Sequence, residues 1–364
     1  MSKRQFVFIT ACFVQGSFMY TMYYYQVVKK ESWITLVAGM LLGLLIAFIY
    51  GSLYKMHFDE GTNTAKGLVE INMDVYGKSA GRMVSLFYIG SLFLSCSRML
   101  REAGQFVAGN LLMGMNWVYI LVILVVLCAW TASYGIKYFA SIGTLFCFFM
   151  YAFTIILFVL LIPNFKFYHL LPIGEETPQA YAKGVLLCTA LPFSEISAFL
   201  ILAPEVVGNK RSDLKKELCY GILAGSPFLL ISVFRDILVL GPLTSYFSYP
   251  GYEVIRLINY KVFSNVESLY GIIIIFLMFF KSALLFYSIA KALSKVLNCK
   301  ESPLFYAAVS FAVLFISQKM ADSNIKLSEM VINKAPYVLL SVNVGIPLVT
   351  LIFAKIKRKS KSRL

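Results

Sequence analysis

Charged residues are scarce in this sequence. Asp, Glu, Lys and Arg make up 14% of its 364 residues, whereas a soluble domain usually carries about 25%. Apolar residues reach 59%, the mean hydropathy is +0.77, and apolar runs such as Ile272 to Phe280 recur along the whole chain. Because a bilayer-spanning helix needs about 20 mostly apolar residues, this composition excludes a soluble domain and predicts a polytopic membrane protein.

Histidine is almost absent as well. Only His57 and His169 occur, far apart in predicted loops, and the seven cysteines form no CxxC pair. A metal site would therefore have few ligands, and the cysteines are interpreted as small buried hydrophobic residues. No nucleophile–base pair, metal cluster or phosphate-binding loop stands out, so the sequence predicts no metal, no cofactor and no enzyme activity.

Acidic residues are outnumbered by basic ones, 18 against 33, which gives a net charge of +15. A nucleic-acid binder clusters its basic residues beside aromatic ones on a soluble face, but here they lie in short loops between apolar spans. The predicted partner is therefore the lipid bilayer and not nucleic acid. Placing both termini in the cytoplasm puts twenty basic residues in inner loops and nine in outer loops, the bias that this topology requires.

The apolar runs divide into about ten predicted transmembrane helices. They lie at about 5–28, 33–54, 82–109, 117–135, 138–162, 183–206, 216–240, 267–295, 303–320 and 335–355. The first has no small-residue cleavage site and is predicted to be a retained span. We expect an all-α fold with one transmembrane domain over 1–364, made of two repeats at about 5–162 and 183–355.

Two of these spans carry polar and helix-breaking residues at mid-depth. The first span contains Gln15, Gly16 and Ser17, and the sixth contains Pro192, Phe193, Ser194 and Glu195. Broken helices at matching positions in two halves point to the binding site of an inverted-repeat transporter. The alternative is that Gly16 permits close helix packing and Pro192 only kinks its helix.

Ionisable residues also occur at membrane depth, where a charge costs at least about 2.5–3.5 kcal/mol at the centre and needs a partner or water. Lys281 lies near the middle of the eighth span, and its predicted partner is Glu195, at a similar depth. This pair could contact a ligand or be purely structural. Arg98 and Glu102, spaced i, i+4, are predicted to pair with each other. Arg235 and Asp236 lie near the outer end of the seventh span.

Tyrosines cluster after the break in the first span. Tyr20 lies next to the break and is predicted to line a pocket. Tyr23, Tyr24 and Tyr25 lie closer to the outer interface, where an aromatic belt explains them.

The run from Leu191 to Glu195, continuing to Pro204 and Glu205, resembles the sixth-span signature of the spore germination permease family, the B subunits of nutrient germinant receptors. Arg98 with Glu102, and Asn265 to Ser268 with Glu267, are similar to that family too. One departure is that the first span has no proline, where relatives often carry a Leu-Pro step.

The resemblance implies membership of the amino acid/polyamine/organocation superfamily and a LeuT-like fold of ten spans. It implies residence in the spore inner membrane, beside an A-type membrane subunit and a C-type lipoprotein. It also implies that a germinant binds between spans one, three, six and eight, which adds Tyr88, Leu92 and Leu285 to the site of Gly16, Ser17, Pro192 to Glu195 and Lys281. Glu267, with Arg98, Glu102 and Asp236, is predicted to be a structural or coupling charge.

Three functions remain open at this point. The leading hypothesis is a transporter-like receptor subunit that senses a small nutrient, such as an amino acid, and triggers germination. The second is an amino acid transporter driven by protons or another cation, in which Lys281 could replace a coupling cation. The third is a scaffold or an ion or water conduit that binds no ligand.

Overall fold

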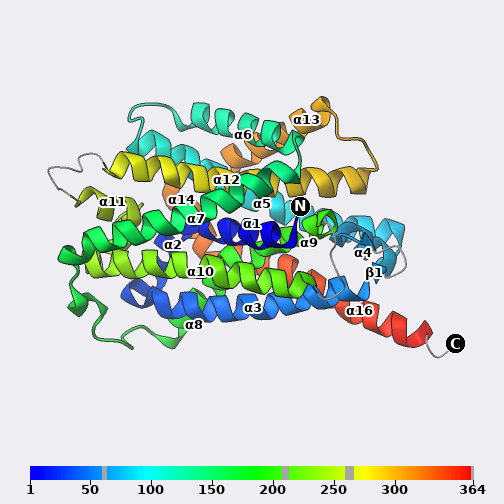
Figure 1. Ribbon diagram of the computed structural model, residues 1–364, viewed down its shortest axis with the longest axis horizontal. Coiled ribbons are helices and arrows are strands. Elements are labelled where there is room, and N and C mark those ends of the chain that lie inside the picture. Colours follow the sequence, from blue (N-terminus) through cyan, green and yellow to red (C-terminus); the bar gives the residue numbers. More distant parts are fainter. Residues whose placement is uncertain (60–63, 207–212, 259–265, 362–364) are drawn as a thin grey trace.

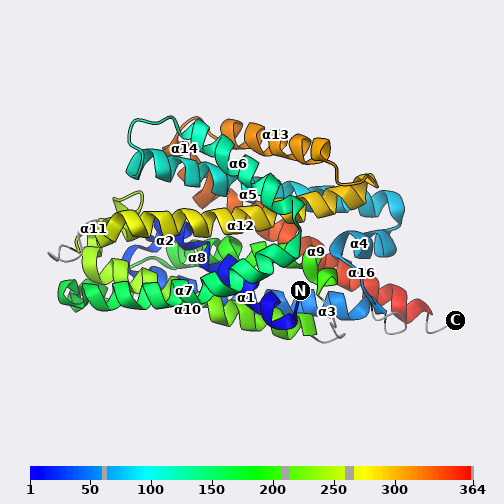
Figure 2. The ribbon, with the colours of Figure 1, turned by 45° about the horizontal axis from the view of Figure 1, so that its top comes forward.

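The computed structural model describes residues 1–59, 64–206, 213–258 and 266–361, and its helices run mostly along one long axis (Figures 1 and 2). The first half of the chain forms α1 (Lys3–Gln15), α2 (Thr21–Val28), α3 (Ser32–Met56), α4 (Leu68–Tyr76), α5 (Lys78–Asn110), α6 (Trp117–Ser133), α7 (Ile136–Leu161) and α8 (Pro178–Cys188). The second half forms α9 (Phe199–Leu202), α10 (Asp213–Leu240), α11 (Pro250–Arg256), α12 (Val266–Leu297), α13 (Pro303–Lys319), α14 (Asn324–Asn333), α15 (Ala335–Leu340) and α16 (Ile346–Lys361). A two-residue strand pair, β1 (Phe58–Asp59) with β2 (Thr64–Ala65), precedes α4.

Several helices start at caps that the sequence encodes. Ser2 and Gln5 form a reciprocal capping box at the start of α1, which satisfies two backbone N–H groups that a helix start leaves free. Thr177 caps α8 and Ser302 caps α13, each followed by a proline in the first helical turn. Proline suits this position because its missing N–H would have no partner there anyway.

The distribution of side chains is that of a protein in lipid. Large apolar residues on the outer surface include Phe87, Leu145 and Phe311, which are 68, 77 and 72% exposed. The interior, in contrast, holds fully buried charged residues such as Glu195 and Lys281. A water-soluble protein rarely exposes such extensive apolar surface, so the bilayer covers this exterior.

The number of membrane crossings is less definite than the fold class. Within the described ranges, seven helices are long and apolar enough to cross a membrane, or eight if the bent α13–α14 pair is one span. One of the seven, Lys3–Met56, has 54 residues, far more than the roughly 20 that a single crossing needs. The short α6 has only 17. All ten expected spans fall on helices, but the count of ten stays a prediction.

Two predicted loops contain helices instead. Between the ninth and tenth spans, α14 bends by 100° from α13. It begins because the Ser323 hydroxyl accepts a hydrogen bond from the Lys326 N–H. Between the second and third spans, α4 packs against α5 and α12. Both helices have ten residues or fewer, so neither has the length of a spanning run.

The first and sixth spans lie inside the bundle. The first packs against α7, α10 and α12, and the sixth packs against α2, α3 and α15. Gly39 and Gly43 bring α3 close to the sixth span, since a Cβ on either would come within 2.7 Å of the Cβ of Cys188 or Phe193. The N-terminus and the end of α16 both lie toward the end of the bundle opposite α11 and α14 (Figure 1).

Candidate functional site

The sixth span (Pro178–Glu205) breaks at its centre. Leu191 leaves the helical conformation (φ −126°, ψ 99°) within a π-helical turn over Thr189–Phe193, because Pro192 has no N–H and its ring clashes with the preceding turn. The Tyr24 hydroxyl donates to the carbonyl of Leu191. The protein itself therefore satisfies this part of the backbone, as a membrane interior requires.

The first span keeps its backbone hydrogen bonds at its polar triplet. The N–H groups of Gly16 and Ser17 still donate to carbonyls of the preceding turn, at 2.9 and 3.0 Å, and a 3-10 helix continues over Phe18–Tyr20. A Cβ on Gly16 would come 2.8 Å from the Leu277 carbonyl oxygen and 2.9 Å from the Cβ of Lys281. Gly16 thus lets α12 approach α1, which is the packing role that the sequence left open.

Four charged side chains meet between the first and sixth spans. We call them the charge cluster: Arg98, Glu102, Glu195 and Lys281. Lys281 Nζ lies 2.5 Å from Glu195 Oε2, and Arg98 Nη2 lies 2.9 Å from Glu195 Oε1. Arg98 Nη1 is 3.8 Å from Glu102 Oε1. Each of the four is at most 3% exposed. Two positive and two negative charges cancel, which makes their burial tolerable.

Aromatic rings and a hydroxyl surround the ammonium group of Lys281. Its Nζ donates to Ser17 Oγ at 2.6 Å and lies 4.6 and 4.5 Å from the ring centroids of Phe13 and Tyr20. The Tyr20 hydroxyl accepts from Arg98 at 2.9 Å and donates to Glu195 at 3.3 Å. Such a desolvated cation–π environment can contribute about 2 kcal/mol. The site therefore already holds one ammonium group beside a carboxylate.

The aromatic-belt interpretation of Tyr23, Tyr24 and Tyr25 is wrong. All three are fully buried, and each hydroxyl bonds inside the protein: Tyr23 to Glu102 at 2.7 Å, Tyr24 to Leu191, and Tyr25 to Asp236 at 3.1 Å. Position along the span fixes depth, but these three side chains of α2 point at neighbouring helices and not at lipid. The predicted pair of Arg98 with Glu102 is present at 3.8 Å, but Arg98 makes a shorter contact, of 2.9 Å, with Glu195.

The other predicted site residues lie around the cluster at different depths. Leu285 is one turn beyond Lys281 on α12 and fully buried. Tyr88 and Leu92 are buried on α5, but at 1.5 Å per residue they lie roughly 15 and 9 Å along the helix from Arg98. Gln15 and Phe193 are also fully buried.

A second polar network was not anticipated from the sequence. The Asn343 side chain accepts from Ser91 Oγ at 2.7 Å and donates to Ser194 Oγ at 3.3 Å. The main-chain carbonyl of Asn343 accepts from the Tyr50 hydroxyl at 2.6 Å. Asn343 lies in a π-helical turn over Ser341–Gly345 of the tenth predicted span, and an Asn within an apolar span is the signal that could have identified it.

The remaining predicted charges lie apart from the cluster. Arg235 pairs with its neighbour Asp236 at 2.7 Å and donates to the Tyr270 hydroxyl at 3.2 Å. Glu267 is half-buried in the first turn of α12, roughly 21 Å along the helix from Lys281. Its neighbour in the motif, Asn265, lies outside the described residues.

A cavity of about 230 Å³ adjoins the charge cluster. Ser95 and Arg98 line its inner wall, and Met320, Met330 and Leu339 are among its apolar lining residues. It lies beside the bend between α13 and α14 and next to α15. The cluster therefore has open space next to Arg98, although its charged side chains are already paired with one another.

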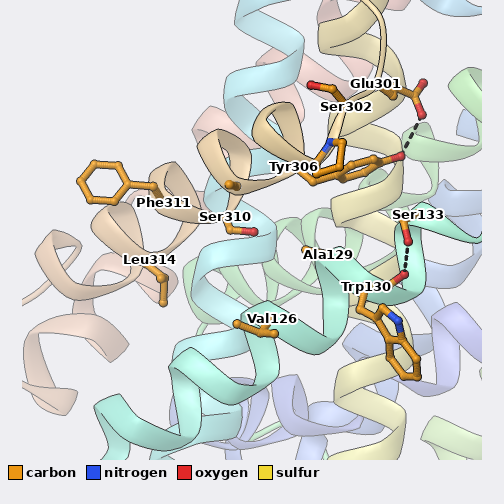
Figure 3. Close-up of a pocket in the computed structure, with 12 residues that line it drawn as sticks. Val126, Ala129, Trp130, Ser133, Glu301, Ser302, Tyr306, Ser310, Phe311 and Leu314 are labelled. Carbon is orange, nitrogen blue, oxygen red and sulfur yellow. Dashed lines mark hydrogen bonds between the residues drawn. The ribbon is translucent and has the colours of Figure 1, made fainter.

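A larger cavity, of about 760 Å³, lies between α6 and α13 (Figure 3). Trp130 and Phe311 line it, and the Tyr306 hydroxyl donates to Glu301 at 2.8 Å. Burial acts to raise the pKa of Glu301, but hydrogen bonds from Lys291 and Tyr306 outweigh it and hold the pKa below its ordinary value. No predicted site residue lines this cavity, so we do not assign the function to it.

Comparison with known proteins agrees with this architecture. A family model described as spore germination protein matches residues 1–325. Among curated proteins, no sequence match is found.

Solved transporters share the fold at low sequence identity. The nucleobase–cation-symport-1 family transporter Mhp1, in a closed conformation with bromovinylhydantoin bound, is 12% identical with a TM-score of 0.65, over 95% of this chain and 77% of that one. A Na⁺-coupled sialic acid symporter is 10% identical with a TM-score of 0.57, over 95% and 88%. A manganese transporter from Eremococcus coleocola is 11% identical with a TM-score of 0.55, over 96% and 77%. The all-α fold is therefore the LeuT-like transporter fold, as expected.

Proposed function

This chain belongs to the spore germination protein family, and on that premise we propose that it is a germinant-sensing, transporter-like subunit of a spore nutrient receptor. In this proposal a small nutrient, such as an amino acid, binds at mid-membrane and triggers germination. What carries the proposal is the charge cluster, which combines a carboxylate, an ammonium and a guanidinium at the break of the sixth span.

The cluster suits a ligand with both an ammonium and a carboxylate group. An incoming ammonium would compete with Lys281 for Glu195, and an incoming carboxylate would pair with Arg98, for which guanidinium geometry is well matched. Ion pairs with the ligand would replace ion pairs within the cluster. The liganded state would then have contacts that the ligand-free state lacks. A ligand shifts a protein between two states only through such differential contacts. The 230 Å³ cavity beside Arg98 is the adjoining space that supports entry.

The receptor setting is part of the same proposal. The bilayer covers the apolar exterior, whereas the A-type membrane subunit, the C-type lipoprotein and the spore inner membrane are what family membership suggests. Cytoplasmic termini are supported by the twenty-to-nine distribution of basic residues. The N-terminus and the end of α16 lie toward the same end of the bundle (Figure 1), as termini on one side of the membrane require. Lys210, Arg211, Lys261 and Arg363 of that distribution lie outside the described residues.

One alternative is a proton- or cation-coupled amino acid transporter. It is favoured by Lys281, a titratable group that occupies the centre of the site where a coupling cation could otherwise lie. The sialic acid symporter of the same fold is Na⁺-coupled. A non-binding scaffold or conduit is the third reading, and the full burial of the cluster favours it.

Spores that lack this gene, germinated against a nutrient panel, would identify the cognate nutrient. Glu195→Gln in the restored gene should abolish the response, measured per molecule of variant protein in the membrane, because the variant keeps the shape of the side chain and removes its charge. Ser17→Ala, a milder change, should shift the half-maximal nutrient concentration by about fivefold or more, since it removes a hydrogen bond from a charged group.

Glu253→Gln is the matched control, because Glu253 pairs only with the exposed Arg256 among the described contacts, and its response should equal wild type. Normal levels with unchanged nutrient sensitivity in both site variants would contradict the proposal. Uptake of the active nutrient into vesicles separates the alternatives, since a transporter accumulates it and a receptor subunit does not.

A further inference from the structure

A small polar cavity lies beside Glu102, on the side that faces away from Lys281. It lies toward the end of the bundle opposite the N-terminus. Its volume is about 40 Å³, and we call it the Glu102 cavity. Four parts of the chain line it, namely α2, α5, the segment before α11, and α14 (Figure 1). The lining residues with side-chain oxygen are Tyr23, Gln26, Glu102, Gln105, Ser248, Tyr249, Asn324 and Ser328.

Glu102 contributes a carboxylate oxygen that has no partner among the residues that the structure describes. Its Oε1 accepts from the Tyr23 hydroxyl at 2.7 Å and lies 3.8 Å from Arg98. Its Oε2 is buried and accepts no hydrogen bond from any described part of the chain. Leaving a charged oxygen buried without a partner costs more than the roughly 1–3 kcal/mol of a neutral group, so a missing partner is indicated. Gln105 lies on the same face of α5, three residues further on.

The size and charge of the cavity restrict what that partner is. A volume of about 40 Å³ exceeds the roughly 10–15 Å³ that a cavity needs to hold one water molecule and is far below the roughly 300 Å³ of a small-molecule pocket, so the space admits a small ion. Among the described residues, no group of three or more His, Cys, Asp or Glu side chains is placed to hold a metal, and Glu102 is the sole acid in this lining. One carboxylate with neutral hydroxyl and amide oxygens suits a hard cation of single charge, since oxygen ligands suit hard cations.

We propose that the Glu102 cavity binds a monovalent cation, with Glu102 Oε2 as its charged ligand and oxygens such as that of Gln105 as neutral ligands. The cation would join α2 and α5 to α14, on the opposite side of Arg98 from the proposed nutrient site. This proposal does not depend on nutrient binding, and its test contains no nutrient.

The test uses the full-length protein in lipid nanodiscs. Thermal unfolding is followed while sodium chloride replaces N-methyl-D-glucamine chloride at constant ionic strength, and then with lithium or potassium chloride. The wild type should show a saturable, cation-dependent rise in Tm, since a ligand that binds only the folded state stabilises it. Glu102→Gln should lose this rise. Gln105→Leu should raise the half-saturating concentration about five- to tenfold, the effect of one lost neutral ligand.

Asp322→Asn is the matched control, because Asp322 is an exposed carboxylate that pairs with Lys326 at 2.7 Å and does not line the cavity. It should keep the wild-type response. If Glu102→Gln is not obtained folded, binding of radioactive sodium to Gln105→Leu decides. The proposal is overturned if Tm is equal in all salts, which indicates water alone, or if folded Glu102→Gln or Gln105→Leu responds as wild type does.

Discussion

Removing one member of the Glu195–Lys281 pair should be strongly destabilising, and the two removals should differ. Breaking a buried pair from one side typically costs about 3–5 kcal/mol. After Lys281→Met, Glu195 keeps Arg98 at 2.9 Å and the Tyr20 hydroxyl at 3.3 Å. After Glu195→Gln, Lys281 keeps only uncharged partners among its described contacts: the new amide oxygen, Ser17 at 2.6 Å and two aromatic rings. Glu195→Gln should therefore lie near the upper end of that range and Lys281→Met near the lower end.

The double variant tests whether the loss belongs to the pair. Because neither partner is then left alone, it should cost less than the sum of the single changes by about 1–3 kcal/mol. The free energy of unfolding can be measured by titrating SDS into protein held in mild detergent micelles. As a control, Lys281→Met should be additive with Glu253→Gln, because Glu253 is half-buried and lies outside the cluster. Additive losses for Glu195 and Lys281, or a larger loss for Lys281→Met than for Glu195→Gln, would refute this account.

Two further changes test packing and topology. Gly16→Ala should lower the free energy of unfolding by about 1–3 kcal/mol, because the new methyl would lie 2.8 Å from the Leu277 carbonyl oxygen. Gly90→Ala is the control: a Cβ there would have nothing within 4 Å, so this variant should be neutral or mildly stabilising in the same unfolding assay. Cys299 is the exposed cysteine on the α12–α13 connection, so an impermeant maleimide should label it only after cells are permeabilised, and labelling of intact cells would contradict cytoplasmic termini.

The sequence was most informative where a residue conflicts with its surroundings. A proline with a carboxylate inside an apolar run located the break at Pro192 and Glu195, and similar depth in two spans was enough to pair Glu195 with Lys281. The i, i+4 rule chose Glu102 for Arg98, but such a pair contributes only about 0.2–0.5 kcal/mol on an exposed helix. Inside the bundle, the carboxylate of Glu195 lies closer.

The sequence did not reveal how each helix is rotated about its own axis. Depth follows from residue number, but which helix faces a side chain depends on tertiary packing, so buried Tyr23 was predicted at the lipid interface. The same limit hid Asn343, whose partners Ser91 and Ser194 come from two other helices. The family's site residues Tyr88 and Leu92 are buried as a packed core would also require, so their role in binding stays a prediction.

The three consecutive tyrosines of α2 restrict how that half-helix can move. Successive side chains point about 100° apart around a helix, and Tyr23, Tyr24 and Tyr25 bond to α5, to the broken sixth span and to α10 respectively. A turn of α2 about its own axis would break all three bonds at once. If α2 instead tilts together with one of these three neighbours, at least one of the three hydrogen bonds is kept. We therefore expect α2 to move as a rigid body in any opening of this protein, without rotating about its own axis.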